Sequence, residues 1–183
     1  YEHIVFDGNE SLSIGSLDND LENPCVVSVF TLSKSFGMAG LRVGYIAAPP
    51  ALMQAMRRVC NHQIYNLSDL AQEAVLAALG APREEYLGFL NEQCSAYQKA
   101  RDLLHQAFPN TVKPPAGAYL FISCGSREAS WRTLHSWLEQ GVSSAPGEAF
   151  GGLHAHCLRL CFTAIPLERL KNAVEILHEV GIS

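Results

Sequence analysis

The most informative segment of the chain reads Thr31-Leu-Ser-Lys-Ser-Phe-Gly-Met-Ala-Gly-Leu-Arg-Val-Gly-Tyr45. It begins at the end of a β-branched run, 25–31, and ends within a second such run, 41–47, and both runs predict strands. Polar and glycine residues over 33–40 separate the two runs and predict a short turn. We therefore expect a strand, a turn that carries hydroxyl groups and a lysine, and a second strand that an arginine enters.

The predicted turn brings together groups that bind phosphate. Hydroxyl groups, an arginine and exposed backbone N–H groups can together form a phosphate cradle. A lysine beside such a cradle, here Lys34, could be partly desolvated, which would favour its neutral amine, a nucleophile toward an aldehyde. An arbitrary lysine is far more often a solvated surface residue. The length of the pattern and its several fixed positions favour the reactive interpretation.

Outside this segment, strands and helices alternate. The pattern predicts helices from Pro50, over 68–79, over 82–108, over 128–139 and from Pro166, with strands over 118–123 and 157–162. Either Asn66 or Ser68 can cap the second helix, which Gly80 stops. This alternation predicts an α/β fold. We place a change of domain near Gly80, between residues 1–80 and 81–183.

Composition argues against two kinds of partner. Hydrophobic residues make up 48% of the chain and charged residues 17%, which favours a packed core over disorder. The formal net charge is −5 and no cluster of lysine and arginine stands out, so we expect no nucleic-acid partner. No apolar run approaches the roughly 20 residues that span a bilayer, so we expect no membrane partner.

The cysteines are typical of a reduced, cytoplasmic protein. The six are scattered and none forms a CxxC pair, so we interpret them as small buried hydrophobes. His154, His156 and Cys157 lie close together and could hold a metal ion. A loop that leads into a strand also explains them and is the favoured interpretation.

Four segments, in order along the chain, resemble one known family. The pattern Ser-Lys-x-Phe-Gly-x-x-Gly-x-Arg-x-Gly over 33–44 is similar to the lysine motif of the class I and II aminotransferases of fold type I, the aspartate-aminotransferase-like group. Pro-Ala-Gly-Ala-Tyr-Leu-Phe over 115–121, Ala-Pro-Gly-Glu-Ala-Phe-Gly over 145–151 and Leu-Arg-Leu-Cys-Phe over 158–162 resemble later segments of that family. The resemblance implies the α/β fold of transferases that depend on pyridoxal 5′-phosphate (PLP). Residues 1–80 would hold the end of the large mixed-sheet domain, and 81–183 the small C-terminal α/β domain.

The resemblance implies a cofactor site around Lys34. In the family, the lysine of this motif forms the internal aldimine with PLP. The arginine of the motif, here Arg42, binds the cofactor phosphate together with the hydroxyls that match Thr31 and Ser33. Tyr1 matches the tyrosine that hydrogen-bonds the 3′-oxygen of the cofactor, and its spacing from Lys34 is the usual one.

Arg159 is the remaining candidate, because it lies inside the apolar run 157–161. An arginine there must face solvent or find a charged partner. An exposed alternate position on an edge strand would explain it from the residues alone. The resemblance implies instead that Arg159 binds the α-carboxylate of the substrate as a bidentate fork.

The resemblance also implies a homodimer. Tyr65, Asn66 and Ser68 lie where the family has a segment near the cofactor phosphate of the neighbouring subunit. An ordinary helix N-cap explains Asn66 and Ser68 equally well.

The function that the resemblance implies is a PLP-dependent aminotransferase, which moves an amino group between an L-amino acid and a 2-oxo acid. Relatives on the same fold are lyases, decarboxylases or cyclases, and these remain alternatives. Another alternative is the effector-binding half of an aminotransferase-like transcription regulator. The presence of both Lys34 and Arg42 argues against loss of the cofactor. Nothing in the sequence indicates which amino acid is the substrate.

One family residue would precede the chain. The aspartate that contacts the pyridine nitrogen lies three residues before the tyrosine in the family motif, and so before Tyr1. We therefore expect these 183 residues to be the C-terminal portion of a longer enzyme. We expect the isolated chain neither to fold normally nor to transaminate, and aldimine absorbance with turnover from it would contradict this.

Overall fold

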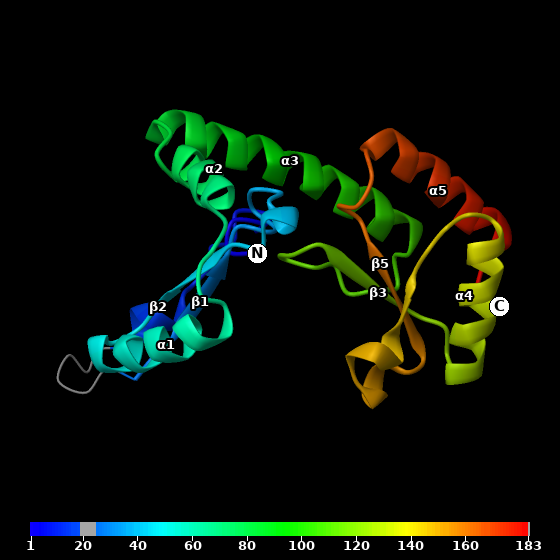
Figure 1. Ribbon diagram of the computed structural model, residues 1–183. Coiled ribbons are helices and arrows are strands. Elements are labelled where there is room, and N and C mark those ends of the chain that lie inside the picture. Colours follow the sequence, from blue (N-terminus) through cyan, green and yellow to red (C-terminus); the bar gives the residue numbers. More distant parts are fainter. Residues whose placement is uncertain (19–24, 183) are drawn as a thin grey trace. The chain divides into compact units, whose positions relative to one another are not determined.

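The computed structural model describes residues 1–18 and 25–182 and has the expected alternation of strands and helices (Figure 1). Its strands are β1 Ser28–Thr31, β2 Gly44–Ala47, β3 Tyr119–Ser123, β4 Ala145–Pro146 and β5 Cys157–Cys161. Its α-helices are α1 Pro50–Gln63, α2 Asp69–Leu79, α3 Arg83–Ala107, α4 Arg127–Glu139 and α5 Leu167–Val180. Four short 3-10 helices are η1 Ile14–Leu17, η2 Ala39–Leu41, η3 Gly147–Phe150 and η4 Gly152–His154. The predicted α/β class is confirmed.

The chain divides into two compact units. The N-terminal unit comprises Tyr1–His3 and Gly8–Asn91, and the C-terminal unit comprises Ile4–Asp7 and Glu92–Ser183. The division by contacts therefore falls inside α3. The change of domain that we expect near Gly80 stays a prediction.

In the N-terminal unit, β1 and β2 form an antiparallel pair whose register runs from Ser28 opposite Ala47 to Thr31 opposite Gly44. Gly44 is required by the close approach of the two strands. A Cβ atom at this position would lie 2.4 Å from the carbonyl oxygen of Phe30. A side chain there would force the strands apart.

Both strands are shorter than predicted. The first begins at Ser28 rather than at residue 25, and the second begins at Gly44 rather than at residue 41. Leu41 ends the 3-10 helix η2, and Arg42 adopts the left-handed conformation with φ of 57°. This conformation interrupts an extended strand, so β2 can start only after it.

In the C-terminal unit, three antiparallel strands form a sheet in the order β3-β5-β4. Leu120, Ile122, Leu158 and Leu160 lie on one face and are buried with residues of α3, α4 and α5, among them Leu104, Trp137 and Leu177. The strand periodicity of two places Tyr119, Phe121 and Arg159 on the opposite face. Arg159 therefore points away from the hydrophobic core.

A buried arginine attaches a remote segment to this unit. Arg101 of α3 is fully buried, and its guanidinium donates to both carboxylate oxygens of Asp7 at 2.7 and 2.8 Å. It also donates to Asp102 at 2.9 and 2.7 Å and stacks on the Phe6 ring at 4.6 Å. The segment Ile4–Asp7 is thereby held against the residues around Pro115, to whose carbonyl Phe6 N donates at 2.9 Å. This pairing could not be predicted from a local sequence pattern, because Asp7 and Arg101 are remote in the chain.

This ion pair predicts a specific pH dependence of stability. Hydrogen bonds from Arg101 hold the pKa of the Asp7 carboxyl below its usual range. A carboxyl with a depressed folded-state pKa stabilises the fold fully above its unfolded pKa, about 3.9, and loses this contribution as pH falls through the folded value. We expect Asp7→Asn to lower the urea midpoint of the complete protein at pH 7, with the difference from wild type shrinking below about pH 4. Glu175→Gln, at an exposed position on α5, is the control. A difference for Asp7→Asn that is constant from pH 7 to pH 3 would contradict the assignment.

Candidate functional site

The hydroxyls of Thr31 and Ser33 lie together where β1 ends. Thr31 Oγ1 donates to Ser33 Oγ at 2.9 Å and accepts from the backbone N–H of Ser33 at 3.1 Å. Thr31 is exposed and Ser33 is half-buried. The two hydroxyls therefore form a polar group that solvent or a ligand can reach.

Lys34 lies on a turn that buried neighbours fix. Leu32 is buried, and its carbonyl accepts backbone hydrogen bonds from Phe36 at 3.3 Å and from Met38 at 3.2 Å. The Lys34 ammonium lies 5.9 Å from the centroid of the Tyr1 ring, at the outer limit of a cation–π contact. The structure thus brings together the lysine and the tyrosine that the sequence singled out.

Lys34 itself is exposed, and its partial desolvation stays a prediction. The turn lies at the end of a two-stranded sheet, and its residues Leu32 and Ser35 are buried. The described residues thus fix the turn and leave the side chain of Lys34 accessible.

Arg42 lies at the end of η2, just before β2. The backbone ladder continues past Thr31 and Gly44 with a bond from Leu32 N to Val43 O of 3.4 Å, and Arg42 directly precedes Val43. Arg42 has a left-handed backbone and donates from Nη1 to Ala39 O at 3.0 Å. A non-glycine residue in this conformation costs about 1–2 kcal/mol, a strain that is more frequent at functional sites.

Ser35 is a further candidate for a residue of the site, and the sequence did not single it out. Its side chain is fully buried, and its hydroxyl has no hydrogen-bond partner among the residues that the structure describes. A buried hydroxyl without a partner costs about 1–3 kcal/mol. A serine beside a lysine gives no signal in a sequence, and only the burial reveals it.

Arg159 lies on the central strand of its sheet, so the edge-strand interpretation was wrong. Its guanidinium carbon lies 4.0 Å from the centroid of the Tyr119 ring and 3.9 Å from that of the Phe150 ring. Arg159 is half-buried, so it still partly faces solvent, and two aromatic rings also contact it. Both rings belong to motifs that the sequence had marked, but their contact with Arg159 needed the three-dimensional structure.

The loop that carries Phe150 is tightly determined. A Cβ atom on Gly147 would lie 2.1 Å from the carbonyl oxygen of His154 and 2.7 Å from that of Cys157, so only glycine fits there. Glu148 pairs with Arg127 at the start of α4, and hydrogen bonds from this arginine lower the pKa of the Glu148 carboxyl. Phe150 also meets Phe121 edge-on, with ring centroids 5.8 Å apart.

The residues before α2, from Tyr65 to Ser68, only partly fit the interpretation as a helix N-cap. Ser68 occupies the N-cap position, but its side chain makes no capping hydrogen bond, so simple capping does not account for its hydroxyl. Tyr65 is exposed and has a φ of 63°, which is unusual for an aromatic residue. The role of Tyr65, Asn66 and Ser68 near a neighbouring subunit stays a prediction.

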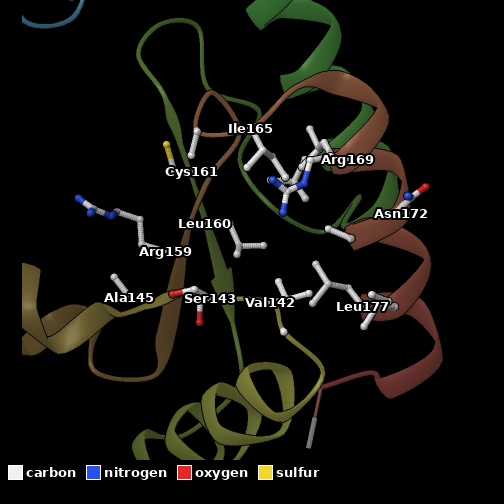
Figure 2. A pocket seen from close by; sticks show the side chains of 17 residues that line it. Val142, Ser143, Ala145, Arg159, Leu160, Cys161, Ile165, Arg169, Asn172 and Leu177 are labelled. Carbon is white, nitrogen blue, oxygen red and sulfur yellow. The ribbon is translucent and has the colours of Figure 1, made fainter. Parts of the chain in front are cut away.

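The C-terminal unit contains a cavity of about 570 Å³ between α5, β5 and residues 141–145 (Figure 2). Its lining is mainly apolar and includes Val142, Leu160, Ile165 and Leu177. In Figure 2, Arg169 reaches from α5 over this cavity, whereas Arg159 extends away from α5. Of the predicted site residues, only Arg159 contributes to the lining.

Two further expectations concern metals and membranes. Within residues 1–18 and 25–182, no three His, Cys, Asp or Glu side chains come together as a metal site. None of the helices described there has both the length and the apolar character needed to cross a bilayer.

Comparison with known proteins identifies the class of this fold and site. The family model for aminotransferase class I and II matches residues 1–177. The aspartate aminotransferase of Pyrococcus abyssi is 31% identical over 98% of this chain and 46% of its own length. That of Geobacillus stearothermophilus is 28% identical over 97% of this chain and 46% of its own. The chain thus spans about half the length of the curated relatives it matches.

Solved structures agree with this result. An aromatic aminotransferase from Pyrococcus horikoshii matches with a TM-score of 0.86 and 28% identity, over 98% of this chain and 48% of its own. An aspartate aminotransferase variant from Thermus thermophilus matches with a TM-score of 0.85 and 28% identity, over 99% and 49%. The fold is therefore that of the C-terminal portion of an aminotransferase. The chain belongs to the class I and II aminotransferase family.

Two glycines test whether the loop of Phe150 depends on close backbone packing. We expect Gly147→Ala to destabilise the complete protein by about 1–3 kcal/mol, because the added methyl group collides with two carbonyl oxygens. Gly152→Ala is the matched control, since a Cβ atom there meets nothing within 4 Å. Urea unfolding of both variants measures the difference. Equal stability of the two would contradict the close packing of this loop.

Proposed function

We propose that the protein is a PLP-dependent aminotransferase that moves an amino group between an L-amino acid and a 2-oxo acid, with Lys34 as the cofactor-bearing lysine. The observation that carries this proposal is the position of Lys34 on a fixed turn, 5.9 Å from the Tyr1 ring and next to the paired hydroxyls of Thr31 and Ser33. Membership of the aminotransferase family supports it. In this proposal residues 1–80 belong to the large domain and 81–183 to the small domain.

The residues of the turn fit a phosphate group. A phosphate takes several hydrogen-bond donors and positive charge, and Arg42, Thr31 and Ser33 offer a guanidinium and two hydroxyls at the two ends of the segment that joins β1 to β2. Thr31 and Arg42 are exposed and Ser33 is half-buried, so a ligand can reach all three. We therefore assign the cofactor phosphate to Arg42, Thr31 and Ser33, and its 3′-oxygen to the hydroxyl of Tyr1.

The cofactor, when bound, supplies an electron sink for the negative charge that develops at the substrate α-carbon. The chain supplies position and proton transfer. Lys34 as a neutral amine accepts the α-proton of the substrate and later returns it. Arg159 binds the substrate α-carboxylate with two parallel N–H donors, which fixes the orientation of the α-carbon.

The substrates we propose are L-amino acids and 2-oxo acids as a class. Relatives are named for aspartate, for aromatic amino acids and for LL-diaminopimelate, so the family likeness supports amino transfer rather than one side chain. All of these relatives are aminotransferases, which disfavours the lyase, decarboxylase and cyclase alternatives. The likeness also supports a homodimer in the cytoplasm.

Replacement of Lys34 tests the function. We expect Lys34→Ala in the complete protein to lower transamination at least about 100-fold, because a positioned proton-transfer group contributes about 10²–10⁴. The assay mixes a panel of L-amino acids with 2-oxoglutarate and measures the new amino acid. Borohydride reduction with PLP, followed by mass spectrometry, should label the Lys34 peptide.

Lys99→Ala, at an exposed position on α3, is the control and should keep full activity and labelling. Unchanged activity of Lys34→Ala, or a label on another lysine, would contradict the assignment. Release of ammonia or carbon dioxide without a new amino acid would point to a lyase or a decarboxylase.

A further inference from the structure

Two arginines in the C-terminal unit have contrasting surroundings. Arg101 is fully buried, and two carboxylates neutralise it. Arg159 is half-buried, and no ion pair is found for it among the described residues. An arginine that serves only the fold has surroundings like those of Arg101, since a charge taken out of water needs a paired charge. Arg159 is instead contacted by aromatic rings, and no described carboxylate pairs with its charge.

The aromatic contacts of Arg159 involve the flat face of its guanidinium, which makes no hydrogen bonds. The rings of Tyr119 and Phe150 have their centroids 4.0 and 3.9 Å from its central carbon, well inside the 6 Å limit of a cation–π interaction. Rings bind a guanidinium through its flat face, whereas its N–H donors lie in the plane and point outward from the edge. Stacking therefore orients the donors without occupying them.

The two rings come from independent parts of the fold, and Phe150 is 41% exposed. Tyr119 lies on β3 opposite Cys161, two residues along β5 from Arg159 and on the same face of the sheet. Phe150 lies at the end of η3, whose position depends on Gly147 and on the pair between Glu148 and Arg127. Rigid neighbours limit the rotamers of a long side chain, and an arginine that is already ordered loses less entropy when it binds.

We infer that Tyr119 and Phe150 are positioning residues, which orient Arg159 so that its N–H edge binds a carboxylate in the bidentate mode. The inference deepens the proposed function, because it rests on Arg159 as the clamp for the substrate carboxylate. According to this inference, the affinity of Arg159 for the substrate carboxylate depends on these two aromatic side chains. Their removal weakens carboxylate binding and leaves contacts with the rest of a ligand unchanged.

The experiment measures binding rather than turnover. The probe is 3-phenylpropionate, which carries a carboxylate and no reactive amine, and its neutral amide is the reference ligand. Calorimetry with the complete protein should show tighter binding of the carboxylate. Phe150→Leu and Tyr119→Leu should each weaken carboxylate binding roughly tenfold and leave amide binding unchanged. Phe150→Tyr and Tyr119→Phe keep a ring and should restore the wild-type affinity.

A double-mutant cycle separates positioning from general packing. Arg159→Met should remove the preference for the carboxylate, and adding Phe150→Leu to it should cause no further loss. Leu153→Ala, at an exposed position in the neighbouring turn η4, is the matched control and should bind like wild type. Additive losses in the cycle would overturn the inference. Wild-type carboxylate affinity in both leucine variants, or equal binding of carboxylate and amide by the wild type, would also overturn it.

The binding experiment and the transamination assay can fail independently of each other. Transamination by the wild type, with carboxylate binding that is insensitive to both rings, would overturn the positioning role and leave the function standing. Carboxylate binding that depends on both rings, in a protein that transfers no amino group, would overturn the function and support the positioning role.

Discussion

The close approach of β1 and β2 at Gly44 is the constraint on which the lysine turn depends. Because the glycine lets the strands meet at the carbonyl of Phe30, the ladder continues to Leu32 and Val43, and both side chains enter the small core with Ala71 of α2. With Leu32 buried, its carbonyl can anchor the turn on which Lys34 sits. Arg42 directly precedes Val43 in the chain. The close approach at Gly44 thus helps to position the turn that carries the lysine, which begins after the hydroxyl of Thr31 and ends before the arginine.

In the C-terminal unit a different constraint applies. Successive side chains of β5 alternate between the hydrophobic core and the opposite face of the sheet. Leu158 and Leu160 are buried with the helices, and the residue between them must therefore point the other way. An arginine at this position is tolerated because the aromatic rings of Tyr119 and Phe150 meet it on the open face. The apolar residues of β5 stabilise the sheet, and the arginine between them points away from the core.

How far the sequence could predict these features depended on the range of the interactions. Helices such as α3 and α4 were predicted to within a few residues, because hydrophobic periodicity is a local signal. The start of β2 was not, since nothing in the local pattern indicates the left-handed conformation that Arg42 adopts before it. Lys34 and Arg159 were singled out by motif, but the motif could not show that Lys34 is exposed or that rings stack on Arg159. The pair of Arg101 and Asp7 joins residues 94 apart in the chain and was invisible to any local pattern.

The two arginines that we propose as anion ligands share one physical property, although they belong to different units. Arg42 is restrained by its left-handed backbone and by its bond to the carbonyl of Ala39, and Arg159 is restrained by two rings. A free arginine side chain carries about 2 kcal/mol of rotamer entropy, which an anion must overcome to hold it. A restraint that exists before the ligand arrives reduces this cost, and leaves more of the electrostatic attraction for affinity. A phosphate and a carboxylate are both small and strongly hydrated, so binding them in water-accessible positions requires donors that are already aimed. In this chain a hydrogen bond to Ala39 restrains Arg42 and two aromatic rings restrain Arg159, contacts that an arginine side chain extending freely into water does not have.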